Sequence, residues 1–341
     1  MTASDGISRR TFVAAGTAAL TGMALAGRNA EAAPEPAPKR ARAGSRLILL
    51  GTAGGPIPRP NRSAPATAVV VGDATWIVDC GNGVARQMAL AGLPLRSIRG
   101  VCITHHHSDH NADYGTLLLL AWTGGLDSRV DTYGPPPLAE MTRQFLEMSD
   151  TDIRARMAEA GRPPLAPLIA PHEIGEAGAG AGAVIEVAAR EDAAREDAAR
   201  EAGVRITAVR VEHPPLATAL AYRFDCPDRS IVISGDTRPS AALVELARGA
   251  DVLVHEVMHV PALEALIARA PSPRALREHL LASHTTTEQV GKLATEAGVG
   301  TLVLSHLVPG GPPVLADEVW RDAVRPHFAG ELVVGRDLLE L

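Results

Sequence analysis

The side chains best suited to chemistry lie in one short run, residues 104–110. The run reads Thr-His-His-His-Ser-Asp-His, so its ligand-type side chains follow the spacing His-x-His-x-Asp-His. The apolar stretch 100–103 directly before it is typical of a buried strand that delivers a loop to a fixed place. Alternate residues of such a loop can point to one side, so His105 and His107 can hold one cation while Asp109 and His110 reach a second. The spacing therefore predicts a two-metal site.

The ligand types also indicate which metal and which kind of site. Imidazole nitrogen and carboxylate oxygen both bind Zn²⁺ at about 2.0–2.2 Å. A structural zinc site is more often rich in cysteine, and residues 104–110 contain none. An open, water-bearing site is therefore favoured. The alternative is a chance histidine cluster, against which the preceding strand argues.

Three more candidate ligands stand at the ends of apolar runs further along the chain. His213 follows the alternating stretch 204–211, Asp236 follows 231–233 and a Ser-Gly turn, and His306 follows 302–304. A single histidine at a strand end is more often structural than a ligand. Three such residues in this order favour ligation.

With these residues in this order, the chain resembles the metallo-β-lactamase superfamily over about residues 46–307. The resemblance implies two sets of metal ligands and a carboxylate that bridges the ions. The first set is His105, His107 and His213. The second set is Asp109, His110 and His306, and Asp236 is the bridging carboxylate.

The resemblance also implies the cofactors and the nucleophile. Two Zn²⁺ ions are expected, with Mn²⁺ or Fe admitted at the second, more oxygen-rich position. A hydroxide held between the ions would attack the substrate, because the cations lower its pKa. Asp79, at the end of the apolar run 76–78, is expected to orient a ligand instead of binding metal. The alternative for Asp79 is a carboxylate at an ordinary strand-to-turn boundary.

Shorter motifs narrow the resemblance to one branch of the superfamily. His255-Glu256, Ser-Gly-Asp-Thr at 234–237 and Ser-His-Thr-Thr at 283–286 resemble the branch of ribonuclease Z and the zinc-dependent arylsulfatase-like and phosphodiesterase-like hydrolases. In that branch His284 would stabilise the developing anion or protonate the leaving group, and would act with Asp109 and Asp236. The alternative is that the His284 side chain only hydrogen-bonds backbone groups at the start of a helix. His255 and Glu256 are expected as polar support under the site.

Hydrophobic periodicity predicts the elements that position these residues. Strands are expected at 46–50, 67–71, 75–79, 100–103, 204–211, 220–224, 230–233, 251–254 and 301–305. Helices are expected near 83–92, 137–160, 240–248, 260–270 and 285–298, the last with Thr285 and Glu288 as a capping box. The fold class is α/β, and the resemblance implies a four-layer αβ/βα sandwich.

The stretches 117–125 and 132–171 are interpreted as pocket and lid. Trp122 and Tyr133 there could stack on an aromatic or sugar-like group, although packing under a long loop is the commoner role for such residues.

The N-terminal segment predicts export. Ser8-Arg9-Arg10-Thr11-Phe12-Val13 is a twin-arginine motif, followed by a moderately apolar core and a small-residue stretch before position 34. That core is too short for a comfortable membrane span, so no stable membrane anchor is expected. We expect a signal peptide at 1–33, a linker at 34–45 and one hydrolase domain at 46–341 with a low-complexity insertion at 176–202. The twin-arginine translocation machinery is then a partner, and the location is periplasmic or secreted.

Composition is that of one enzyme domain. The 33 basic and 39 acidic side chains give a net charge of −6, which does not favour nucleic-acid binding. Cys80, Cys102 and Cys226 lack Cys-x-x-Cys spacing and are expected to act as small buried hydrophobes. The sequence leaves a homodimer open.

These observations predict an exported dinuclear zinc hydrolase acting on a small sulfate ester or phosphodiester. Only 23 positions separate His213 from Asp236 (236 − 213), too few for the long transfer-RNA-clasping arm of bacterial ribonuclease Z. A lactonase or other carboxylic-ester hydrolase on the same ligands is the alternative enzyme. A periplasmic metal-binding protein without chemistry is the alternative outside enzymes.

Overall fold

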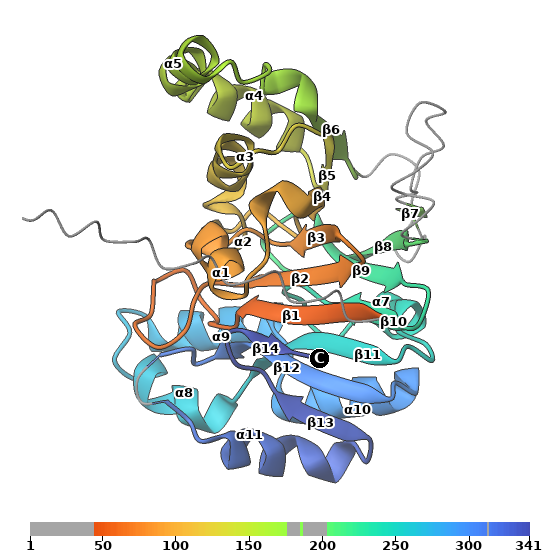
Figure 1. Ribbon diagram of the computed structural model, residues 1–341. Helices are drawn as coiled ribbons and strands as arrows, with labels where there is room; N and C mark the ends of the chain where they lie inside the picture. Colours follow the sequence, from red (N-terminus) through yellow and green to blue (C-terminus); the bar gives the residue numbers. More distant parts are fainter. Residues whose placement is uncertain (1–43, 176–184, 187–202, 312–313) are drawn as a thin grey trace, which may run out of the picture. The chain divides into compact units, whose positions relative to one another are not determined.

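Two seven-stranded sheets form the centre of the protein in this computed structural model, which describes residues 44–175, 185–186, 203–311 and 314–341 (Figure 1). The first sheet has the order β14-β1-β2-β3-β4-β5-β6 and the second β13-β12-β11-β10-β9-β8-β7. In each sheet the antiparallel strand pairs lie on one side and the parallel pairs on the other.

The first sheet consists of β1 (Ser45–Gly51), β2 (Ala66–Val71), β3 (Ala74–Val78), β4 (Ile98–Cys102), β5 (Val130–Gly134), β6 (Ile169–Glu173) and β14 (Leu339–Glu340). The second consists of β7 (Ile185–Glu186), β8 (Arg205–Val211), β9 (Ala219–Asp225), β10 (Ser230–Ile233), β11 (Val252–Met258), β12 (Thr301–Val308) and β13 (Glu331–Val334).

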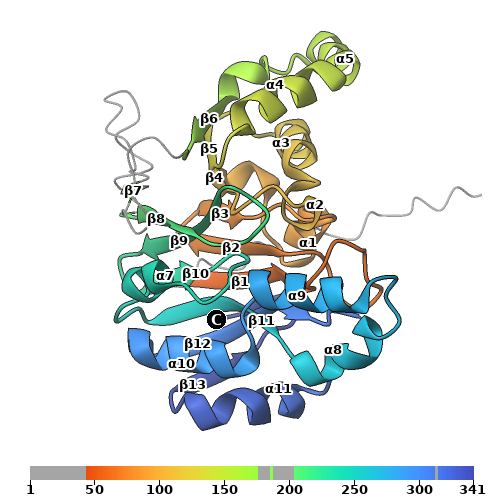
Figure 2. The same cartoon turned by 180° about the vertical axis from the view of Figure 1, so that it is seen from behind.

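Helices follow in the same two halves. With the first sheet are α1 (Val84–Leu90), α2 (Ser108–Asn111), α3 (Tyr114–Thr123), α4 (Leu138–Met148) and α5 (Asp150–Ala160). With the second are α7 (Ala241–Leu246), α8 (Val260–Ile267), α9 (Pro273–Ser283), α10 (Thr287–Ala297) and α11 (Asp317–Val324), and Figure 2 shows α9 and α10 in front of β11 and β12. None of the helices in the described ranges is both long and apolar enough to cross a bilayer.

Alternation of side chains along the strands separates three cores and so produces four layers. In β1, Leu47 and Leu49 pack with Tyr222 of β9 in the core between the sheets. Their neighbours Ile48 and Leu50 pack on the other face, among residues of α1 and α3. A third core joins the second sheet to α7, α10 and α11. The sandwich predicted from the sequence is therefore confirmed.

The stretches 117–125 and 132–171, expected to be pocket and lid material, consist mostly of helices and strands, and their role at a substrate stays a prediction. Residues 117–123 belong to α3, and the second stretch contains most of β5, all of α4 and α5, and the start of β6. Trp122 is fully buried, and its indole Nε1–H donates to the Pro163 carbonyl at 2.8 Å. Trp122 thus packs in the core and cannot stack on a substrate.

Two helix predictions also need correction. The pattern at 137–160 is two helices, which meet at Ser149. The capping box before α10 is formed by Thr286 and Gln289, whose side chains each bond the other's backbone N–H. Thr285 instead donates its hydroxyl to the Thr237 carbonyl at 2.7 Å, which removes it from the cap.

The predicted leader 1–33, nearly all of the linker 34–45, and the insertion 176–202 apart from β7 lie outside the described residues. These remain predictions. Of the three free cysteines, Cys80 and Cys102 are fully buried and Cys226 is half-buried. Burial raises the pKa of all three thiols, which suits packing better than reactivity.

Candidate metal centre

The Asp79 carboxylate holds the start of the loop that follows β4. Asp79, at the end of β3, accepts the backbone N–H of Thr104 and its hydroxyl, each at 2.8 Å. The Thr104 carbonyl accepts the backbone N–H of Leu220 from the other sheet at 2.9 Å. The start of the loop is therefore clamped between both halves of the sandwich.

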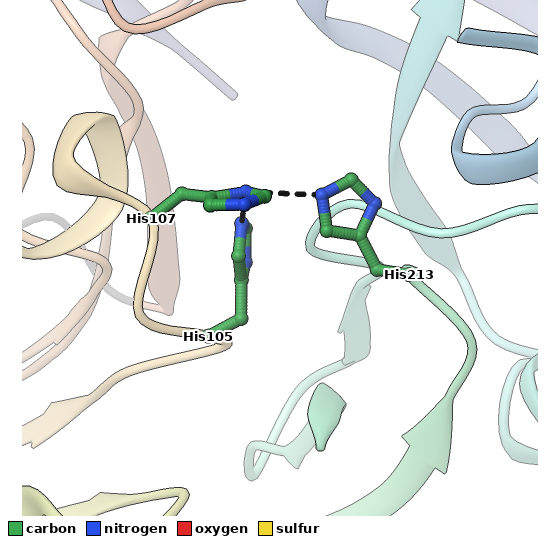
Figure 3. Close-up of side chains that lie close together, drawn as sticks. All are labelled: His105, His107 and His213. Atoms are coloured by element: carbon green, nitrogen blue, oxygen red, sulfur yellow. Dashed lines mark hydrogen bonds between the residues drawn. The ribbon is translucent and has the colours of Figure 1, made fainter. Parts of the chain in front are cut away.

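Three imidazoles from this loop and from the end of β8 point toward one another, as Figure 3 shows. His107 Nδ1 lies 3.1 Å from His105 Nε2 and 3.1 Å from His213 Nε2. His105 and His107 come from the β4 loop, and His213 comes from the end of β8. We call these three residues the first ligand set.

Hydrogen bonds on the far ring nitrogens aim two of these rings. His213 Nδ1 donates to the Ser283 carbonyl at 2.8 Å, so its Nε2 carries the lone pair. Because the Thr104 hydroxyl already donates to Asp79, His105 Nδ1 donates to that hydroxyl at 3.0 Å. Each ring thus presents an unprotonated nitrogen to the centre of the set, the form a metal ligand needs.

Asp109, His110 and His306 form the second ligand set. The Asp109 carboxylate lies 3.7 Å from His110 Nε2 and 3.5 Å from His306 Nε2. His110 Nδ1 donates to Asp79 at 2.7 Å, which directs Nε2 toward the set. His306 has a positive φ of 43°, an uncommon conformation for a histidine, at the point where the pairing of β12 with β11 shifts register.

Asp236 lies between the two sets. Its carboxylate is 3.4 Å from His110 Nε2 and 3.3 Å from His306 Nε2, and 3.8 Å from His213 Nε2. Among the described residues, Asp236 Oδ1, His110 Nε2 and both nitrogens of His306 are buried without a hydrogen-bond partner. Such orphaned polar atoms are costly unless something else satisfies them.

His284 stands beside both sets and is held by Glu256. Its Nδ1 donates to the Glu256 carboxylate at 3.1 and 3.2 Å. Glu256 Oε1 also accepts the backbone N–H groups of Thr237 and Thr285, at 3.0 and 3.3 Å. The segments that carry Asp236 and His284 are thus tied to one carboxylate.

His255 is placed differently from its neighbour. Its Nδ1 donates to the Glu256 carbonyl at 2.6 Å, and among the described residues its Nε2 has no partner. In β11, Val252 and Val254 face the core between the sheets, whereas Leu253 and Val257 face the helices. Alternation therefore places His255 on the helix side and Glu256 on the side of the ligand sets.

The charges of the cluster favour a cation. Burial alone would lower the pKa of His110, but the carboxylates of Asp236 and Asp79 outweigh it and raise that pKa well above its usual value. Burial opposes ionisation of Asp109, yet His306 and His110 lower its pKa to about 2. In the first ligand set, burial is the largest cause of the lowered pKa of His105, His107 and His213. Imidazoles with a lowered pKa are neutral near pH 7 and can bind metal.

The donor set fits a divalent ion. Nitrogens bound to one tetrahedral zinc at about 2.0–2.1 Å would lie roughly 3.3 Å apart, close to the spacing in the first ligand set. The ligand-type atoms within each set all lie within 4.8 Å of one another. Asp236 and His284 lie equally close to members of both sets. A cation would also satisfy the orphaned atoms of Asp236, His110 and His306.

All seven ligands named from the sequence therefore lie together, and Asp79, Glu256 and His284 touch or adjoin them. Sequence reasoning missed Thr104 and Ser283, which orient His105 and His213. Thr104 directly precedes the histidine run and was open to inference. The Ser283 carbonyl gave no signal, because any residue supplies one.

Comparison with known proteins agrees with this geometry. The family model described as the metallo-β-lactamase superfamily matches residues 60–306. A ribonuclease Z of Mycobacterium bovis is 32% identical over 297 residues, covering 86% of this chain and 96% of that protein. A ribonuclease Z of Mycobacterium avium is 34% identical over 300 residues, with the same coverage of both chains.

Solved structures agree on the fold. The short form of human tRNase Z has a TM-score of 0.62 at 20% identity, covering 87% of this chain and 98% of that one. The metallo-β-lactamase fold protein YhfI of Bacillus subtilis has a TM-score of 0.57 at 20% identity, with the same coverage. The chain belongs to the metallo-β-lactamase superfamily, as a metal-dependent hydrolase related to ribonuclease Z.

Proposed function

We propose that this protein is an exported dinuclear zinc hydrolase that cleaves a small phosphodiester or sulfate ester. The observation that carries the proposal is the position of Asp236, within 4.0 Å of ring nitrogens from both ligand sets. A carboxylate has two oxygens and can join two ions about 3.5–4 Å apart. When bound, such ions supply a hydroxide nucleophile at neutral pH and neutralise the anionic oxygens of the ester.

The remaining steps belong to the chain's own residues. Asp79 accepts from His110 Nδ1 and the Ser283 carbonyl accepts from His213 Nδ1, so the Nε2 atom of each ring is aimed at its ligand set. The hydroxide that bound ions supply would form the new bond to phosphorus or sulfur while the bond to the ester oxygen breaks. His284 donates a proton to that leaving oxygen. Its proton is available because Glu256 raises the pKa of His284 to about 9, against the effect of burial.

The connection between His213 and Asp236 supports a small substrate. Half of its 22 intervening residues (236 − 213 − 1) belong to β9 and β10, which are ordinary strands of the second sheet. No projecting arm for a folded RNA is formed by these residues, all of which the structure describes. Export and the net charge of −6 point the same way.

Ribonuclease activity is a second candidate function, favoured by the relatives that are named ribonuclease Z. It shares the ligands and the phosphodiester chemistry, so the site alone does not separate the two. A carboxylic-ester hydrolase would use the same residues with an acyl carbon in place of phosphorus.

The test pairs metal content with turnover of matched 4-nitrophenyl esters: sulfate, bis-phosphate, phosphonate and acetate. About two zinc ions per chain and turnover of the sulfate or the phosphodiester are expected. Turnover of acetate alone would replace the proposal with a lactonase or esterase. Cleavage of an RNA with a 3′ extension, without turnover of the small esters, would replace it with a ribonuclease. Bound metal without turnover of any of these would leave a metal-binding protein.

The predicted leader has its own test. Fusing residues 1–45 to a folded reporter should direct it out of the cytoplasm through the twin-arginine route. Replacing Arg9 and Arg10 together with Lys should abolish this. Export that persists in the double variant would contradict the assignment.

A further inference from the structure

A cavity of about 230 Å³ opens beside the ligand loop. The residues that line it are His106, Pro135, Pro136, Gly175, Leu216, Ala217 and Thr218. We propose that this cavity binds the uncharged organic group of the ester, a single aromatic or aliphatic ring, and so selects the substrate. The inference rests on the proposed function, because it names the part of the ester that this chain recognises.

The position of the cavity relates it to the ligands. His106 lies in the chain between His105 and His107, so one wall belongs to the β4 loop itself. The opposite wall begins at Leu216, whose backbone N–H donates to the His213 carbonyl at 3.0 Å. Two of the segments that line the cavity thus also carry residues of the first ligand set. The proposal requires that an ester group attached to a ring in this cavity reaches that set, and the KM measurements below test this.

The wall at the end of β5 is joined firmly to the ligand loop. His106 Nε2 donates to the Pro135 carbonyl at 2.8 Å, and His106 Nδ1 accepts the side-chain amide of Asn111 at 3.0 Å. Both ring nitrogens are therefore used within the protein. His106 presents its ring to the cavity as a surface for packing and offers no free N–H.

The chemistry of the walls favours an uncharged group. Among the described residues that line the cavity, none is acidic and none is lysine or arginine. Two prolines, a leucine and an alanine supply apolar surface, and the Thr218 hydroxyl supplies one polar group. A charged substituent would lose water in this cavity without gaining a partner.

The volume sets the size of the occupant. A cavity of about 150 Å³ holds a benzene molecule. One substituted ring therefore fits into about 230 Å³, whereas two stacked nucleobases do not. Burying such a ring is expected to raise affinity roughly tenfold or more.

The experiment fills the cavity and measures binding separately from turnover. Leu216→Trp and Ala217→Trp each place a larger ring at a position that lines the cavity. Leu90→Trp on α1 is the control, because Leu90 is exposed and its helix lies on the outer face of the first sheet. Binding of benzyl alcohol and of glycerol to the metal-loaded proteins is followed by NMR titration, and KM and kcat are measured with bis(4-nitrophenyl) phosphate.

The wild type and Leu90→Trp should bind benzyl alcohol saturably and bind glycerol much more weakly. Both cavity variants should weaken benzyl alcohol binding roughly tenfold and raise KM by a similar factor with kcat nearly unchanged. Unchanged binding and KM in both variants would overturn the proposal. If the wild type turns over the ester but does not bind benzyl alcohol, the cavity inference fails and the function stands. If binding is lost in the variants but the wild type hydrolyses no ester, the proposed function fails and the cavity inference stands.

Discussion

At the scale of single residues, the centre depends on Asp236, the carboxylate that faces both ligand sets. Replacing it by alanine removes the shared ligand and leaves several buried nitrogens without a compensating charge. We expect Asp236→Ala to lower turnover by at least about a hundredfold and to reduce the metal content, as measured by elemental analysis of the purified protein.

Asp322→Ala is the matched control, since it removes an exposed carboxylate of α11. It should change neither quantity. Full metal content together with lost turnover in Asp236→Ala would show that Asp236 acts in chemistry without holding metal. Weaker metal retention in a protein that has no turnover to lose would favour the metal-binding alternative.

The pair Glu256 and His284 predicts a particular pH dependence. The Glu256 carboxylate raises the pKa of His284 to about 9 against the effect of burial, so the proton-donating form is populated below that pH and lost above it. Glu256→Gln removes the negative charge and should lower the alkaline limb of the kcat profile by about one to two pH units. The measurement is kcat against pH for the metal-loaded protein.

In Glu256→Gln the amide retains a hydrogen-bond acceptor, so a merely structural role would lower kcat at all pH values alike. An alkaline limb at the same pH in wild type and variant would contradict the assignment of His284 as proton donor. His284→Ala should remove that limb altogether.

The residues of the centre differ in how far the sequence reveals them. The spacing of His105, His107, Asp109 and His110 is local, and it is visible without any fold. His213, Asp236 and His306 needed the pattern of strand ends in addition. His255 and Glu256 are adjacent in a strand, so alternation alone places them on opposite faces, and assigning both to support of the site disregarded that alternation. The Ser283 carbonyl could not be found, because backbone acceptors have no residue type.

At the scale of elements, the capping box of α10 yields a prediction about stability. Thr286→Ala removes the acceptor for the Gln289 backbone N–H and should cost about 1 kcal/mol of folding stability. Thermal unfolding followed by circular dichroism measures this.

Glu288→Ala is the comparison for the cap. Glu288 belonged to the expected capping box, but its side chain pairs with Lys292 on the exposed surface. Such a surface pair contributes little, so the loss should be smaller than in Thr286→Ala. A larger loss in Glu288→Ala would contradict the assigned cap.

Tyr222 of β9 connects the second sheet to the ligand loop. Its buried hydroxyl donates to the Ile103 carbonyl at 2.9 Å, next to the Thr104 clamp. Tyr222→Phe leaves that carbonyl without its side-chain donor and should cost about 1–3 kcal/mol. The free energy of unfolding in urea checks the value. Tyr133→Phe is the control, because among the described residues the Tyr133 hydroxyl has no hydrogen-bond partner.

Most strands next to the ligands were predicted, whereas the outlying elements were not, for identifiable reasons. β6 contains Pro171 and β5 contains Asp131, so neither strand has the apolar run typical of an interior strand. α3 is apolar on nearly all sides, so it lacks the amphipathic period by which a surface helix is predicted. β14, with two residues, is too short for a pattern. In these elements tertiary packing decides the structure, and one sequence does not display that packing.

At the scale of the whole molecule, metal should stabilise the fold, because the ligands come from both sheets. Bound ions at one hundred times their dissociation constant would add about 2.7 kcal/mol per site. Removing metal with a chelator should therefore lower the unfolding midpoint, and restoring zinc should recover it. Calorimetry measures both. An unchanged midpoint in a protein shown to have lost its metal would contradict ligation across the two sheets.

The spread of the ligands along the chain has a consequence for biogenesis. His105 and His306 are 201 positions apart (306 − 105), so the first ligand set is incomplete until His213 is in place and the second until His306 is in place. An incomplete or truncated chain can therefore expose the histidine run 105–110 without forming the complete metal centre. Such a chain should hold metal weakly, so tight metal retention would distinguish the completely folded protein from unfinished chains.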